Sequence, residues 1–117
     1  MNTPDKIFDL SYLSDLYGND EEAVKHSVSV LLETLPDDIE KLENAYYQKD
    51  WLAFFNAGHK LKTPVRMLHV GNIFPIMEEM VEATRGGKYN PEVDNMFSQV
   101  LPVLKEVFIQ LSRYVNS

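Results

Sequence analysis

The chain has 117 residues and no cysteine, and its 18 acidic and 11 basic side chains give a net charge of −7. The absence of cysteine excludes disulfides, zinc–thiolate centres and thiol catalysis. The negative charge, with no basic stripe to offset it, argues against binding to nucleic-acid phosphates. No run approaches the roughly 18 apolar residues of a membrane span, and the start lacks the pattern of a signal peptide. We therefore expect one cytoplasmic domain comprising residues 1–117.

The first helix-start signal lies at the beginning of the chain. Thr3, Pro4 and Asp5 supply a cap, a proline and an acid, and predict a short helix that Gly18 ends. Its inward side is expected to hold four apolar residues: Ile7, Leu10, Leu13 and Leu16. The sequence leaves a break near Ser11 open.

A second start signal, Asn19-Asp20-Glu21-Glu22, precedes a long amphipathic segment. Its apolar residues recur mostly three or four positions apart. They are Val24, Val28, Leu31, Leu32, Leu35, Ile39, Leu42 and Tyr46. Pro36 interrupts the segment, but the pattern keeps its phase. We therefore expect a kink or a tight junction at Pro36 rather than a change of direction.

Asp50 is expected to cap a third helix that begins at Trp51. Pro64 falls inside this helix, where the ring removes a backbone hydrogen bond and predicts a kink. Gly71-Asn72 is expected to end the third helix and to cap a fourth, in which Pro75 lies in the first turn.

Glycines at positions 86 and 87 break the chain after the fourth helix. Asn90-Pro91-Glu92 then starts a last helix by the same cap-and-proline logic, and Pro102 predicts a second kink. Short connections favour antiparallel neighbours, and no run alternates long enough to form a strand. The predicted fold is therefore all-α, an antiparallel up-down four-helix bundle with a short extra N-terminal helix.

His59 lies on the polar side of the third predicted helix. At about 100° per residue, the opposite side holds the residues that would pack into the bundle. They are Phe54, Ala57, Leu61, Val65 and Leu68. The side of His59 holds Phe55, Asn56, Lys62, Thr63 and Arg66. A neutral imidazole offers a nucleophilic nitrogen, and Lys62 is one helical turn away, while Lys60 and Arg66 widen the positive environment. An ordinary solvated helix face can contain the same pair, and spacing alone leaves both explanations open.

The stretch Gly58-His59-Lys60-Leu61-Lys62 resembles the His-x-Leu-Lys core of the histidine-containing phosphotransfer (HPt) family. Leu35-Pro36, Leu42, Ala45 and Asp50 before it, and Glu78-Glu79 after it, are also similar. The resemblance covers about Leu13 to Glu82. Three positions depart from the pattern: Thr63 and His69 stand where the family usually has glycine, and Pro64 is also unusual.

The resemblance implies a phosphoryl carrier in multistep two-component signalling. His59 would accept phosphate from an aspartate of a response-regulator receiver domain and pass it on, and Lys62 would stabilise the transferring group. The implied docking residues are Phe55, Asn56, Lys60, Thr63 and Arg66. The partner would be such a receiver or a hybrid histidine kinase. Mg²⁺ would be bound by the receiver, since this chain shows no metal constellation or cofactor motif, and the protein would act as a monomer.

Two other functions are weighed against this one. An HPt-like adaptor would bind a receiver or kinase without carrying phosphate; Thr63 and His69 leave this alternative open, whereas intact His59 and Lys62 argue against it. An independent enzyme is disfavoured, because no paired carboxylates, nucleophile–base arrangement or glycine-rich phosphate loop is visible. His26, one turn after Glu22, is expected to form a weak surface pair, and His69 is expected to pack at a helix end.

Overall fold

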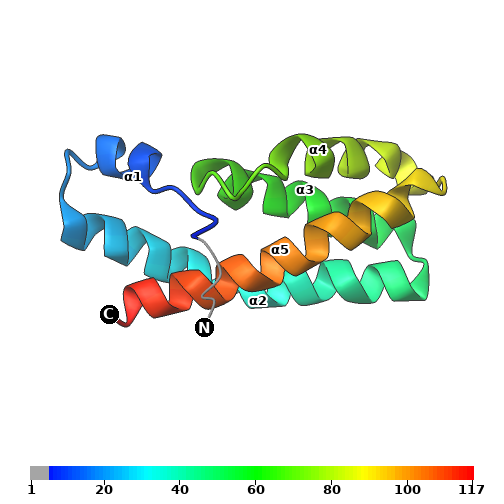
Figure 1. Ribbon diagram of the computed structural model, residues 1–117. Helices are drawn as coiled ribbons and strands as arrows, with labels where there is room; N and C mark the ends of the chain where they lie inside the picture. Colours follow the sequence, from blue (N-terminus) through cyan, green and yellow to red (C-terminus); the bar gives the residue numbers. More distant parts are fainter. Residues whose placement is uncertain (1–5) are drawn as a thin grey trace, which may run out of the picture.

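The computed structural model describes residues 6–117 and is all-α. Its elements are α1 (Ser11–Leu16), α2 (Glu21–Gln48), α3 (Trp51–Met67), α4 (Phe74–Ala83), the short 3-10 turn η1 (Arg85–Gly87) and α5 (Glu92–Val115). The four main helices alternate in direction (Figure 1). Both α3 and α5 pack against α2, and both also pack against α4. The predicted four-helix bundle with a short N-terminal helix is confirmed.

Two of the predicted helix starts, those of α2 and α3, are confirmed by side-chain caps. Asp20 accepts a hydrogen bond of 3.2 Å from the backbone of Ala23 at the start of α2. Asp50 likewise accepts one of 3.1 Å from Ala53 in α3. Before α5, the side chain of Asn90 accepts a bond of 2.9 Å from the Glu92 backbone, but the residue that caps this helix is Pro91, which makes no side-chain cap hydrogen bond. Each cap satisfies a backbone donor that the first helical turn leaves unpaired.

The predicted cap of α4 is wrong. The residue that caps this helix is Ile73, and it makes no side-chain cap hydrogen bond; its carbonyl accepts a 2.7 Å bond from Met77. The chain reaches this point through a turn in which His69 and Gly71 have positive φ values of 46° and 48°. This turn moves the helix start beyond Asn72, while Pro75 still lies in the first turn as predicted.

Proline interrupts none of the three helices that contain one beyond the first turn. Pro36, Pro64 and Pro102 lie inside α2, α3 and α5, which continue past them. Pro36 and Pro102 are on the exposed side of their helices. The apolar residues before and after each proline therefore stay in the same core, as the unbroken phase of the α2 pattern predicted.

The first segment of the chain differs from its prediction in two ways. Thr3, Pro4 and Asp5 lie outside the described residues, and α1 begins only at Ser11, where Asp9 accepts a 2.8 Å bond from the Ser11 backbone. Leu13 is buried as predicted, whereas Leu16 is 57% exposed. Because α1 has only six residues, its single inward position is taken by Leu13 and Leu16 faces solvent.

Residues before α1 hold the α3–α4 connection in place. The backbone of Asp9 donates a 2.8 Å hydrogen bond to Leu68, and that of Gly71 donates one of 2.6 Å to Ile7. Phe8, between them, is buried in the core. The turn that leads into α4 is therefore tied to a distant part of the chain.

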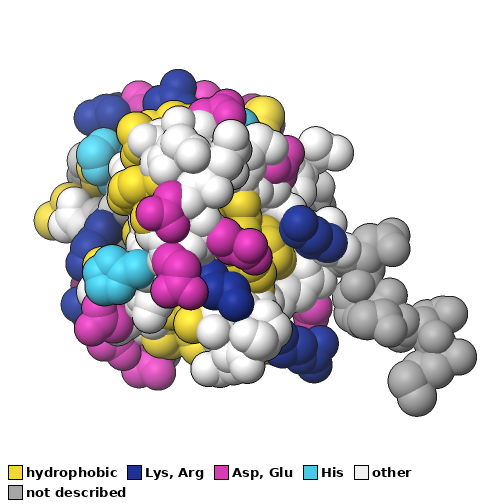
Figure 2. All heavy atoms as spheres, turned by 90° about the vertical axis from the view of Figure 1, so that its left-hand side faces the viewer, with side chains coloured by type: hydrophobic (Ala, Val, Ile, Leu, Met, Phe, Trp, Pro, Cys, Tyr) yellow, Lys and Arg dark blue, Asp and Glu magenta, His cyan; other side chains and the backbone are white. Residues whose placement is uncertain are grey.

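The surface at the α1 end of the bundle is chemically mixed. Figure 2 shows acidic, basic and hydrophobic side chains interleaved there, without a broad area of one kind. Within residues 6–117, no helix is both long and apolar enough to cross a membrane.

Candidate functional site

His59 occupies the middle of α3 and is exposed, as predicted from the helical period. All five residues predicted for the opposite side are buried. They are Phe54, Ala57, Leu61, Val65 and Leu68. The helix therefore presents the imidazole to solvent because its apolar positions anchor the other side in the core.

The surface beside His59 is a shallow groove between α3 and α4, with a volume of about 290 Å³. Its α3 side consists of His59, Lys62, Thr63, Arg66 and Met67, and its α4 side consists of Phe74 and Glu78. The groove thus joins His59 with three of the residues that the sequence placed on its side. It also adds two α4 residues that the helical period of α3 does not reveal.

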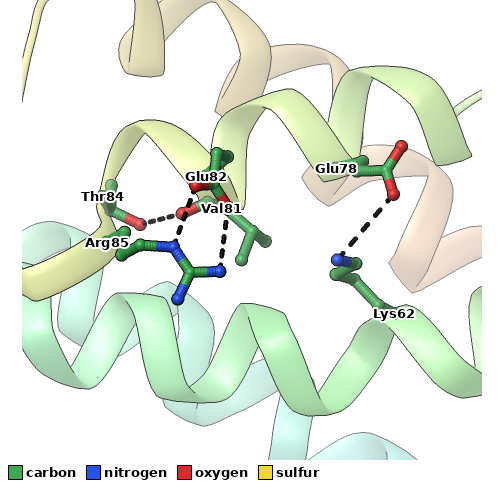
Figure 3. A network of polar contacts seen from close by, with 6 residues as sticks. All are labelled: Lys62, Glu78, Val81, Glu82, Thr84 and Arg85. Carbon is green, nitrogen blue, oxygen red and sulfur yellow. Dashed lines mark hydrogen bonds and ion pairs between the residues drawn. The ribbon is translucent and has the colours of Figure 1, made fainter.

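Lys62 crosses the groove toward α4. Its side chain is only 26% exposed, and Nζ lies 3.9 Å from Oε2 of Glu78, which is 57% exposed (Figure 3). Arg66 leans on the first turn of α4, with its guanidinium carbon 5.4 Å from the centre of the Phe74 ring. The groove therefore holds two cations and one carboxylate next to the imidazole.

Gly58, the residue before His59, allows α4 to approach this closely. It is buried, and a Cβ atom at this position would lie 2.7 Å from Cγ2 of Val81 in α4. Contacts this short are not tolerated between carbon atoms that are packed at about 3.5–4.0 Å. The glycine next to His59 therefore sets the distance between the two helices that form the groove.

A further cation, Arg85 of η1, contacts the ring of Phe55, which in turn contacts the ring of His59. Phe55 is partly buried. The centre of its ring lies 5.6 Å from that of the His59 ring, and the guanidinium carbon of Arg85 lies 5.0 Å from the centre of the Phe55 ring. Glu82 holds Arg85 with bonds of 2.8 and 3.0 Å (Figure 3). The hydrogen bond lowers the pKa of Glu82 and raises that of Arg85. Phe55, expected as an exposed aromatic contact, is partly covered instead.

Lys60 lies on the other side of His59, toward α2. Its Nζ is 3.2 Å from Oδ1 of Asp38, whose residue is only 6% exposed. Lys60 and Asn56 line a separate depression of about 510 Å³ between α2 and α3. The charge of Lys60 is therefore paired with a buried carboxylate on α2.

The other two histidines, His26 and His69, do not line the groove of His59. His26 is exposed on α2. His69 is exposed in the turn after α3, so the packing role expected for it is wrong. The pKa of the neighbouring Asp9 carboxyl is lowered, first by hydrogen bonds from Ser11 and only then by the charges of His69 and Lys6. Among residues 6–117, no three histidine or acidic side chains gather as a metal site would require.

No known family model, curated protein or solved structure matches this chain. An exposed imidazole, two nearby cations and an open groove suit a small anionic group bonded to the ring. The groove is open to solvent, so a group bonded to the ring would be accessible from outside.

Proposed function

We propose that this protein is a phosphoryl carrier of multistep two-component signalling, with His59 as the residue that is phosphorylated. The observation that carries the proposal is the exposed imidazole of His59 in one groove with Lys62 and Arg66. The resemblance of this stretch to the HPt core supports the same assignment. The four-helix bundle is an architecture that such a carrier can use, although a bundle alone implies no function.

The proposed reaction begins with the unprotonated ring nitrogen of neutral His59. This nitrogen attacks the phosphorus of an aspartyl phosphate on the receiver domain, so that a P–N bond forms while the P–O bond to the aspartate breaks. The aspartate leaves as a carboxylate with the bonding electron pair. The ring retains the proton on its second nitrogen or loses it to water. Attack by the aspartate of a second receiver reverses these steps.

Lys62 is the residue proposed to stabilise the transferring group. Phosphoryl transfer depends mainly on in-line positioning and on neutralising the charge of the phosphoryl oxygens. Lys62 is one turn from His59, the distance at which helix side chains interact. Its partly buried amine is screened less by solvent than a fully extended lysine would be.

The receiver is proposed to dock over α3, around the exposed imidazole. Thr63 and Arg66 would be contacted on the α4 side, and Asn56 and Lys60 on the α2 side. Phe55 would help to orient His59, because the two rings are stacked with their centres 5.6 Å apart. The receiver would bring the Mg²⁺ on which its own aspartate chemistry relies.

Transfer from a receiver domain loaded with radiolabelled aspartyl phosphate tests the proposal. Label should pass to the wild type within the assay, should fail to reach His59→Gln, and should reach Lys62→Ala more slowly. His26→Gln, which alters an exposed histidine outside the groove, should behave as the wild type. A receiver that binds tightly but transfers no label would favour the adaptor function, for which Thr63 in place of the usual glycine is the supporting feature.

A further inference from the structure

Glu78 is the one acidic side chain among the described residues that line the groove of His59. It comes from α4, whereas His59 and both groove cations come from α3. Its carboxylate oxygen is 3.9 Å from Nζ of Lys62. Close packing of Gly58 against Val81 brings the two helices together at this point. The carboxylate of Glu78 is therefore close enough to attract Lys62, the cation proposed to stabilise the phosphoryl group.

The two charges compete for the same ammonium. A phosphoryl group carries about −1.5 to −2 charge near neutral pH, so on His59 it would draw Lys62 away from Glu78. The carboxylate would then lose its partner and remain beside a group of like charge. Both effects raise the free energy of the phosphorylated protein relative to the unphosphorylated one.

Resting on the proposed function, we propose that Glu78 is a positioning residue that limits the lifetime of the phosphohistidine. When the P–N bond breaks, its electron pair returns to the ring nitrogen and the phosphoryl group passes to water or to a receiver carboxylate. In a loose transition state the negative charge on the phosphoryl oxygens spreads out. A nearby carboxylate therefore destabilises the bound phosphoryl group more than the departing one, and speeds its release.

The size of the effect follows from Coulomb's law. Unit charges a few ångströms apart at a hydrated surface interact by an energy that corresponds to roughly a threefold to fivefold change in rate. The interaction is screened within about 8 Å at physiological ionic strength. We expect Glu78→Gln to lengthen the phosphohistidine lifetime about threefold at low salt, and to do so less at high salt.

The experiment uses phosphoramidate, which phosphorylates histidine without a protein partner. The ring nitrogen of His59 attacks phosphorus, the P–N bond of the reagent breaks and ammonia leaves. After removal of the reagent, the decay of the phosphohistidine signal is followed by ³¹P NMR in low and high salt. Glu79→Gln is the matched control, because Glu79 is an exposed neighbour in α4 that does not line the groove. It should decay as the wild type does.

A double-variant cycle shows whether Glu78 acts through Lys62. In the background of Lys62→Gln, Glu78→Gln should lengthen the lifetime less than it does in the wild type. If Glu78 had a purely structural role, the change in lifetime caused by Glu78→Gln would be the same at low and high salt. It would also be the same with and without Lys62. Equal lifetimes for the Glu78→Gln and Glu79→Gln variants would overturn the inference.

The outcomes separate this inference from the function on which it rests. If phosphoramidate labels the wild type but no receiver does, the phosphorelay role is contradicted. The effect of Glu78 is then still measured from the rate at which the phosphohistidine decays. Transfer from receivers together with a lifetime insensitive to Glu78 would contradict only the inference. Failure of both phosphoramidate and receiver domains to label His59 would contradict both.

Discussion

Replacement of Gly58 by alanine tests how the site is built. In a helix interior, alanine is more favourable than glycine by about 1 kcal/mol. Here the added Cβ would lie 2.7 Å from Cγ2 of Val81 and 3.6 Å from Cδ1 of Leu42. Val81 is 1% exposed and β-branched, so its methyl group has no second low-energy rotamer in a helix. Because overpacking a core costs about 1–3 kcal/mol, we expect Gly58→Ala to lower the free energy of unfolding by about 1 kcal/mol.

Urea unfolding followed by far-UV circular dichroism measures this change. The matched background is Val81→Ala, which removes the methyl group that the new Cβ would meet. In that background Gly58→Ala should be neutral or should stabilise the protein by up to about 1 kcal/mol. A Gly58→Ala single variant that is more stable than the wild type would refute the argument that this glycine sets the spacing of α3 and α4.

Four further substitutions, the last two compared as a pair, test separate parts of the account. Tyr46→Phe should cost about 1 kcal/mol, because Tyr46 donates a 2.5 Å hydrogen bond to Asp94. This bond raises the pKa of Tyr46 from 10.0 to about 12. The stability that the bond contributes is therefore fully present below about pH 10 and is lost as the pH rises toward 12. Urea unfolding between these pH values should show a smaller fall in the free energy of unfolding for Tyr46→Phe than for the wild type. Asp50→Ala should lower the free energy of unfolding by about 1 kcal/mol through loss of the α3 cap, measured by urea unfolding. Lys60→Gln should leave the phosphohistidine lifetime in the ³¹P assay unchanged, whereas Lys62→Gln should shorten it.

Each of these expectations has a contrary result. Equal alkaline losses in Tyr46→Phe and the wild type would show that the phenol bond does not contribute as stated. An unchanged unfolding midpoint for Asp50→Ala would remove the cap from the account of α3. A shorter lifetime in Lys60→Gln would mean that this residue acts at His59 despite its ion pair with Asp38.

The parts of the fold that depend on nearby residues were predictable. Asp20, Asp50 and Asn90 each bond to a backbone donor two or three residues ahead, so a cap signal in the sequence places the helix start. The start of α4 instead follows a turn held by Ile7 through its bond from Gly71. A bond between such distant positions leaves no local pattern, and the predicted cap at Asn72 failed there.

The candidate site divides in the same way. His59 and Lys62 share a face of one helix, so the helical period was enough to bring them together. Glu78 joins them because α4 packs against α3, and Arg85 because η1 packs against α3; periodicity within a single helix does not encode either contact. Lys60 has the right spacing to serve His59, but a buried acid on α2 provides its partner. Tertiary contacts therefore determine which neighbouring charges act at the imidazole.

The location of the phosphoryl group tests the central claim most directly. The protein is incubated with a receiver domain carrying radiolabelled aspartyl phosphate, and the label is tested for stability in acid and alkali and assigned to a peptide by mass spectrometry. The account predicts an acid-labile, alkali-stable label on the peptide containing His59, retained in His26→Gln and His69→Gln variants and absent from His59→Gln. Label on another residue, or none from any receiver that binds, would contradict it.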